Sequence, residues 1–171
     1  MLDLGFSPCS NLLASVSKNR QLSLYFRWSY IENSSQKFKN FDISQKIDDF
    51  LAHNKSAIDP ENLRKKEFYF IPLVTREIHS KLIFSVSVSE SCQFVATGSR
   101  DKKVKVFKIF GEKGFDLQEI WSYKFKSAVR AVEFLKGQTR FLAIGLENGQ
   151  ILIADINGIN IFFLIFRSEN P

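Results

Sequence analysis

The side chains best suited to acid–base or metal chemistry are two histidines that lie far apart in the sequence. His53 lies in a polar stretch and His79 precedes an apolar segment, and no Ser or Cys nucleophile pattern surrounds either. Imidazole titrates near neutral pH and ligates metals. The two cysteines, Cys9 and Cys92, are too few for a disulfide framework. The spacing of these four residues is not that of a zinc site, so we expect no metal, no cofactor and no catalytic residue.

Other features that would indicate a bound ligand are also missing from the sequence. Residues 111–114 (GEKG) fit a connecting turn and lack the pattern of a phosphate-binding loop. The longest apolar run near an end, residues 161–166, is too short to span a bilayer. We therefore expect no small-molecule substrate and no membrane contact. With two cysteines and no signal-peptide pattern, the expected location is the cytoplasm, with the nucleus as a second compartment.

Three 14-residue segments align without gaps and predict the elements that position these residues. They are residues 12–25 (LLASVSKNRQLSLY), 94–107 (FVATGSRDKKVKVF) and 141–154 (FLAIGLENGQILIA). Each begins with an apolar strand, continues through a polar turn that contains Asn19, Asp101 or Asn148, and ends in a strand of alternating character. Asn and Asp favour such turns because their side chains bond nearby backbone groups. Each segment therefore predicts a β-hairpin.

A further strand is expected before and after each hairpin. The preceding candidates are residues 2–6, 83–88 and 129–134, and the following ones are 68–74, 117–123 and 159–166. Four antiparallel strands make one blade of a β-propeller, and hairpins that start at 94 and 141 have close to the spacing of WD-type repeats. We predict an all-β fold of about three four-stranded blades of an incomplete ring. The blades are residues 1–28 with 67–78, residues 79–125, and residues 126–171.

The first hairpin is separated from the second by more residues than one blade needs. The excess falls in residues 29–66, which are rich in Ser, Asn, Lys and Asp and lack sustained periodicity. We predict an inserted surface loop between the third and outer strands of the first blade. A short helix around residues 43–53 is expected because its apolar residues are helically spaced.

The second repeat resembles a WD repeat in the residues that hold a blade together. Such repeats place a His before the first strand, a Ser or Thr on the second, an Asp in the hairpin turn and a Trp at the end of the third strand. His79, Thr97 and Asp101 match three of these positions, and Phe107 replaces the Trp, which removes an indole donor. An imidazole bonded to a buried carboxylate is a charge-assisted contact. The resemblance therefore implies that His79 has a structural role.

Residues 78–107 also resemble a particular family, that of elongator complex protein 2. Residues 97–106 (TGSRDKKVKV) match its pattern closely, and Phe84 and Phe107 stand where the family has Trp. The resemblance covers residues 2–28 and 67–156. It implies a non-catalytic WD-repeat scaffold that acts in tRNA wobble-uridine modification through assembly of the elongator complex. The implied partners are other elongator subunits, including the catalytic acetyltransferase-like one. Because the family has two full propellers, the resemblance implies that this chain is a fragment of one of them. Three blades cannot close a ring, and their open apolar faces would make the isolated chain poorly soluble or self-associating.

The net charge of +6 is concentrated near the second hairpin. Residues 79–110 hold six Lys or Arg and two acidic residues, which gives +4 in that window. Arg100, Lys102, Lys103 and Lys105 form a candidate patch for RNA or another polyanion, with tRNA as one candidate contact. The alternative is a solvated strand edge kept soluble by Lys. A WD scaffold of an unrelated complex is the third hypothesis.

Overall fold

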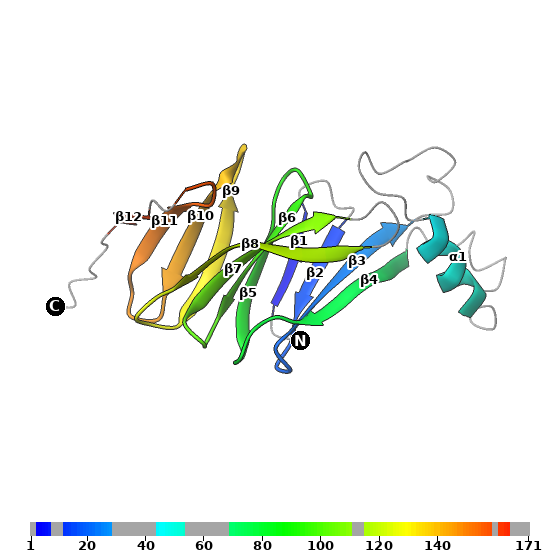
Figure 1. Ribbon diagram of the computed structural model, residues 1–171, viewed down its shortest axis with the longest axis horizontal. Coiled ribbons are helices and arrows are strands. Elements are labelled where there is room, and N and C mark those ends of the chain that lie inside the picture. The colour runs from blue at the N-terminus through cyan, green and yellow to red at the C-terminus, as the bar shows by residue number, and fades with distance from the viewer. Residues whose placement is uncertain are drawn as a thin grey trace.

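The computed structural model describes residues 3–7, 12–28, 44–53, 69–110, 115–158 and 161–164. These residues form three four-stranded antiparallel sheets that stand side by side, with one helix at the end of the row (Figure 1). In each sheet the strands follow one another in chain order, so that consecutive strands pair. The predicted all-β fold of three four-stranded blades is therefore confirmed.

The first sheet comprises β1 (Asp3–Phe6), β2 (Leu12–Val16), β3 (Gln21–Trp28) and β4 (Tyr69–Glu77). Side chains alternate along a strand, and β2 accordingly buries Leu12, Ala14 and Val16 while its other two residues are half-buried. The helix α1 (Ser44–His53) lies between β3 and β4 in the chain, where a short helix is predicted, and it contacts β4. The rest of the predicted 29–66 insertion lies outside the described residues.

The second and third sheets repeat this arrangement. The second comprises β5 (Ile83–Val88), β6 (Phe94–Ser99), β7 (Lys103–Phe110) and β8 (Asp116–Lys124). The third comprises β9 (Val129–Leu135), β10 (Gln138–Leu146), β11 (Ile151–Asp155) and β12 (Ile161–Leu164). The outer strand predicted at 159–166 is described only over β12, and the remainder of the tail lies outside the described residues.

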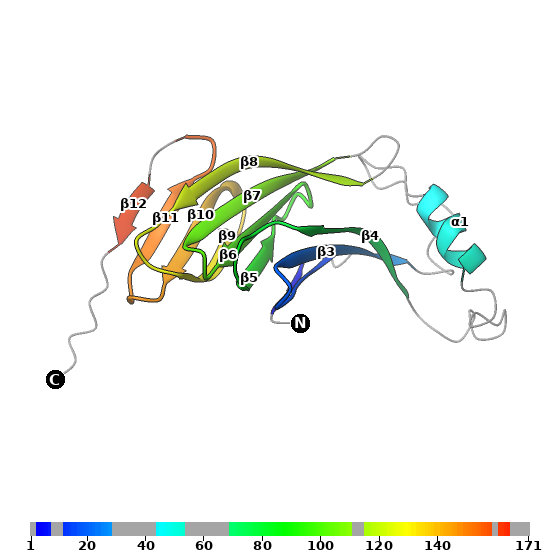
Figure 2. The same ribbon diagram turned by 60° about the horizontal axis from the view of Figure 1, so that its bottom comes forward.

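The first strands of the sheets are neighbours, because β5 contacts both β1 and β9. The turned view shows the same row of sheets, with α1 at one end (Figure 2). The second sheet is apolar on both faces. Val95, Phe107 and Ile109 belong to the core shared with the first sheet, whereas Val104 and Val106 belong to the core shared with the third. Because side chains alternate between the two faces of β6 and β7, this one hairpin contributes to both cores. A blade that lies between two others requires this arrangement.

The three hairpin turns have the same backbone geometry. The residue after Asn19, Asp101 or Asn148 has a positive φ in each case, and its N–H donates to the carbonyl three residues earlier. These residues are Arg20, Lys102 and Gly149, with φ of 67°, 72° and 83°. The left-handed conformation is costly for residues with a side chain. In the second hairpin, the side chains of Ser99 and Asp101 accept hydrogen bonds from backbone N–H groups of the turn and hold it in place.

Candidate functional site

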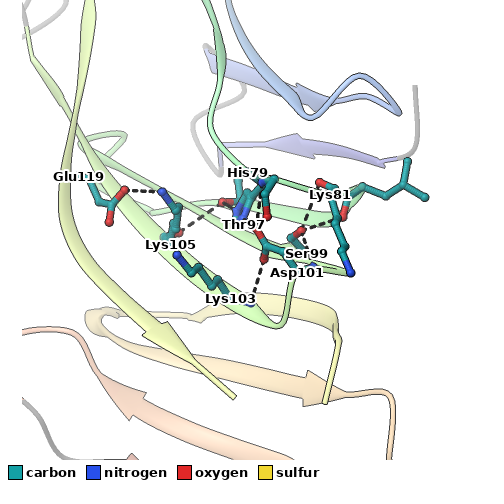
Figure 3. A network of polar contacts seen from close by, with 10 residues as sticks. His79, Lys81, Thr97, Ser99, Asp101, Lys103, Lys105 and Glu119 are labelled. Carbon is teal, nitrogen blue, oxygen red and sulfur yellow. Dashed lines mark hydrogen bonds and ion pairs between the residues drawn. The ribbon is translucent and has the colours of Figure 1, made fainter. Parts of the chain in front are cut away.

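His79 is the centre of a polar network that joins three segments of the second sheet (Figure 3). Its Nδ1 lies 2.9 Å from Asp101 Oδ2 in the β6–β7 turn, and its Nε2 lies 2.9 Å from Thr97 Oγ1 on β6. The His79 side chain is fully buried, and that of Asp101 is 5% exposed. Because the imidazole is enclosed, it cannot reach a substrate in solution, and its two nitrogens are both used within the protein.

The carboxylate of Asp101 also organises the backbone around it. Oδ2 accepts from Ser80 N–H at 3.1 Å, and Oδ1 accepts from Lys103 N–H at 2.9 Å. The Asp101 N–H donates to Ser99 Oγ at 3.1 Å, and the Ser99 hydroxyl donates to the carbonyl of Leu82 at 2.8 Å. The segment that enters the sheet is thereby tied to the hairpin turn by charge-assisted and neutral bonds.

The environment of His79 defines its protonation state. Burial lowers the pKa of His79 below its ordinary value of 6.5, and the attraction of Asp101 only partly offsets this effect. Burial would raise the pKa of Asp101, but His79 and the N–H groups of Lys103 and Ser80 lower it below 3.8. The imidazole is therefore neutral at pH 7. Its Nδ1–H donates to Asp101, and its Nε2 accepts the hydroxyl proton of Thr97.

Phe107, which stands where a WD repeat has Trp, and the turns of the other two hairpins form fewer polar contacts than the His79 network. Phe107 is buried in the core between the first and second sheets, on the same face of β7 as Lys105, and offers packing in place of a donor. In the third hairpin, Asn148 Oδ1 accepts from Gln150 N–H at 3.3 Å. Asn19 occupies the equivalent turn of the first sheet. Neither asparagine has a His before the first strand of its sheet in the described ranges.

The four residues of the predicted cationic patch separate into two groups. Lys105 Nζ lies 2.6 Å from Glu119 Oε2 on β8, so its charge is paired (Figure 3). Arg100 and Lys102 are exposed in the turn, and Lys103 is half-buried beside them. Backbone bonds bring further cations to this edge, because Arg100 N–H donates to Leu82 O and Phe125 N–H donates to Lys102 O. We define the cationic edge as Lys81, Arg100, Lys102, Lys103, Lys124 and Lys126.

Side chains of one sheet also cap backbone N–H groups of the next, a feature that sequence reasoning missed. Asp3 Oδ2 accepts from Val86 N–H at 2.9 Å, between the first and second sheets. Ser87 Oγ accepts from Phe134 N–H at 3.1 Å, between the second and third. The sequence signal that could have predicted the second of these caps is its spacing. The donor lies 47 residues after Ser87, and the second and third aligned hairpins also start 47 residues apart.

Within the described ranges, no group of three His, Cys, Asp or Glu residues is placed to hold a metal ion. Over the same part of the chain, no helix is long and apolar enough to cross a membrane.

Comparison with known proteins agrees with this architecture. A family model described as WD domain, G-beta repeat, matches residues 70–108, which run from β4 of the first sheet through β7 of the second. The crystal structure of the Cps50 (Swd1) β-propeller domain of Myceliophteria thermophila is similar, with a TM-score of 0.60 and 14% sequence identity. The alignment covers 98% of this chain and 39% of that structure. Comparison with curated protein sequences finds no match.

These observations define the class of the protein. The fold is that of a β-propeller segment, and residues 70–108 form a WD repeat whose His79, Thr97 and Asp101 make the contacts described above. At 14% identity, the likeness to the Swd1 propeller is a likeness of fold.

Proposed function

We propose that the chain is a non-catalytic WD-repeat scaffold that acts in tRNA wobble-uridine modification by assembling the elongator complex. The observation that carries this proposal is the stretch 97–106, whose sequence resembles elongator complex protein 2. These ten residues form the end of β6, the turn and the start of β7, and they include Thr97 and Asp101 of the His79 network.

The location of the polar side chains supports a scaffold over an enzyme. Of the two histidines, His79 is enclosed and both of its nitrogens are bonded within the protein. His53 is exposed on α1, where its Nδ1 lies 2.7 Å from the carbonyl oxygen of Asp49. The network therefore stabilises a surface that partners can contact, as rigid sheets and turns do in protein interfaces. The partners that we propose are other elongator subunits, including the catalytic acetyltransferase-like subunit. The compartments that we propose are the cytoplasm and the nucleus.

Affinity purification of the tagged natural protein, at full length, tests this proposal. We expect the catalytic elongator subunit to be recovered, and we expect depletion of the protein to lower wobble-uridine modification in tRNA. A tag-only strain controls for background. Recovery of a different assembly, with tRNA modification unchanged, would support a WD scaffold of an unrelated complex and would exclude the elongator role.

The cationic edge favours a second candidate function, binding of RNA or another polyanion. Lys81, Arg100, Lys102, Lys124 and Lys126 are exposed, and the acidic residue among them, Asp101, is engaged by His79. The segments that contain these residues are joined by backbone hydrogen bonds, so the positive charges are held on one edge of the second sheet. A fixed group of cations attracts phosphates and releases counterions on binding.

RNA affinity measured at two salt concentrations tests the second candidate. We expect steep weakening at the higher salt concentration, with a log–log slope of about 0.7 for each phosphate contacted on a single-stranded RNA. The double charge reversal Lys102→Glu with Lys103→Glu should reduce both the affinity and this slope. Lys108→Glu is the matched control, because Lys108 is exposed at the far end of the same strand, opposite Phe94. Equal affinity for all three proteins would exclude the cationic edge.

A further inference from the structure

Aromatic side chains form a row along β8 and just beyond its end. The rings of Trp121 and Tyr123 are nearly parallel, with centroids 6.3 Å apart and an angle of 17° between their planes. The ring of Tyr123 also lies against that of Phe125, with centroids 4.8 Å apart. Phe125 is buried and Trp121 is half-buried, whereas Tyr123 is 41% exposed. The middle ring is therefore held in place by a ring on each side and still presents surface to a ligand.

Tyr123 is exposed although the sheets on both sides of β8 are in place. It pairs with Val104, and Trp121 pairs with Val106, so the two rings lie on the face of the second sheet that packs against the third. All four strands of the third sheet are described, and β9 follows β8 directly in the chain. The ring is thus exposed at the outer edge of two packed sheets, away from the first and last strands of the chain.

Tyr123 lies where β8 meets the cationic edge. The next residue, Lys124, belongs to that edge and pairs with Lys103 on β7. The N–H of Phe125 donates to the carbonyl of Lys102 at 2.8 Å, so the exposed hairpin turn lies at the same end of the strand. Lysines of the cationic edge therefore flank the exposed ring both along the chain and across the sheet.

The carboxylates of this part of the second sheet are engaged by other side chains. Glu119 Oε2 lies 2.6 Å from Lys105 Nζ, and Asp101 Oδ2 lies 2.9 Å from His79 Nδ1. Within the described ranges, the lysines of the cationic edge have no carboxylate partner. The surroundings of Tyr123 therefore favour a negatively charged ligand.

An exposed ring beside fixed cations matches the two parts of a nucleotide. The base has a flat π face that stacks on an aromatic side chain, and the phosphate binds an ammonium group. A ring that its neighbours hold in one orientation loses little side-chain freedom when a base stacks on it. In an RNA duplex the bases stack on one another, so only an unpaired base can reach the ring. A purely acidic protein segment would use the cations and leave the ring without a partner, so RNA accounts for both features.

We propose that this surface binds single-stranded RNA, with one unpaired base stacked on the ring of Tyr123 and the adjoining phosphates bound by Lys102 and Lys124. The inference rests on the second candidate function and deepens it, because it names the form of RNA and the residue that selects it. Phosphate contacts alone carry no information about the bases. Tyr123 determines the specificity, since a base is available for stacking only in a single strand.

The RNA affinity of the full-length natural protein tests the proposal. The probes are a short oligouridine as the single strand and the same strand annealed to oligoadenine as the duplex. Tyr123→Ala should weaken the binding of oligouridine about fivefold to a hundredfold, the effect of losing one stacked base. Tyr123→Phe keeps the ring and should bind oligouridine as the wild type does. Ile120→Ala is the matched control, because it removes an exposed apolar side chain from the same strand and should leave the affinity unchanged.

The salt dependence and the duplex separate this inference from the second candidate function. The log–log slope reports the number of phosphates contacted, so Tyr123→Ala should lower the affinity for oligouridine without changing the slope. The same variant should bind the duplex as the wild type does, whereas Lys102→Glu with Lys103→Glu should weaken the binding of both RNAs. If Tyr123→Ala binds oligouridine like the wild type while the lysine variant binds it weakly, the stacking inference is wrong and the cationic edge stands.

Polyglutamate is the probe for an acidic protein segment. The wild type should bind polyglutamate more weakly than oligouridine, because polyglutamate has no base to stack on Tyr123. Equal or tighter binding of polyglutamate would overturn the assignment of RNA in favour of an acidic protein partner. A wild-type protein that binds neither RNA would overturn both this inference and the second candidate function.

Photo-cross-linking tests the stacked base directly and does not depend on the folding of a variant. Irradiation breaks the carbon–iodine bond of 5-iodouridine and joins the base to an aromatic ring on which it is stacked. We expect mass spectrometry to identify Tyr123 as the residue joined to an oligouridine that contains this nucleotide. Unmodified oligouridine is the control and should give no cross-link. Cross-links confined to other residues, or none at saturating RNA, would overturn the proposal.

Discussion

A methyl group on Gly98 would lie 2.7 Å from Cγ1 of Val129, a separation that real Cβ contacts do not show. Gly98 is buried, and Val129 and Val132 of the third sheet occupy the space that a side chain would need. The close approach of these two sheets therefore depends on the absence of a side chain at one position of β6.

Gly98→Ala should destabilise the chain by about 1–3 kcal/mol, because an added methyl group in a packed core forces the neighbouring side chains to shift. Val129→Ala removes the opposing methyl groups, so the double variant should lose less free energy of unfolding than the sum of the two single variants. Urea unfolding of the four proteins measures the coupling. Additive losses would show that the two residues do not interact.

Asp101→Asn should lower the free energy of unfolding by about 1–3 kcal/mol, because one of the two carboxylate oxygens that accept N–H groups becomes an amide donor. The loss should depend on His79, which bonds the same carboxylate. In a double-mutant cycle with His79→Gln, we expect the effects to be non-additive. Asp48→Asn, an exposed position on α1, is the control and should have little effect.

Acidification should destabilise the chain through His79. The pKa of this group in the folded chain is below its ordinary value of 6.5, so near that pH the folded state binds fewer protons than the unfolded state. The contribution of the neutral His79 to the free energy of unfolding is therefore fully present above pH 6.5. It is lost as the pH falls toward the pKa of His79 in the folded chain. The lowered pKa of Asp101 acts in the same direction, but below its ordinary value of 3.8.

Thermal unfolding at several pH values measures this effect. Between about pH 7.5 and about pH 5.5 the melting temperature of the wild type should fall more than that of His79→Gln, which has no imidazole to protonate. Parallel pH profiles for the two proteins would contradict the assignment of a neutral buried imidazole at position 79.

Ser87→Ala should destabilise the contact between the second and third sheets. The substitution leaves the Phe134 N–H without the hydroxyl that accepts it at 3.1 Å. A buried donor without a partner costs about 1–3 kcal/mol. Hydrogen exchange at Phe134 should accelerate, whereas Ser122→Ala, at an exposed position of β8, should leave it unchanged. Unaltered exchange in both variants would show that this bond does not hold the two sheets together.

Much of the site is local in sequence, and this is why it could be predicted. The aligned hairpins place Thr97 on the strand before the turn and Asp101 in the turn, with Asn19 and Asn148 in the equivalent turns. Turn chemistry and the period-two alternation of side chains act over a few residues. The bonds that His79 makes then depend only on the pairing of β5 with β6, which a hairpin unit already implies.

Contacts between segments could not be predicted in the same way. Lys105 has the sequence context of a free cation, but the pairing of β7 with β8, which includes a bulge between Val106 and Phe107, brings Glu119 to it. The location of Ser87 against Phe134 and of Gly98 against Val129 depends on how one sheet packs on the next.

The sequence alone therefore determined the class of fold and the three hairpins, because strand alternation and turn formation are local. Its resemblance to a WD repeat indicated the residues of the His79 network. Only the tertiary structure decided which cations remain unpaired at the cationic edge, which serines cap the neighbouring sheet and which glycine makes room for it. Those outcomes depend on the distance and register between sheets, and these are set by side-chain packing across the two cores.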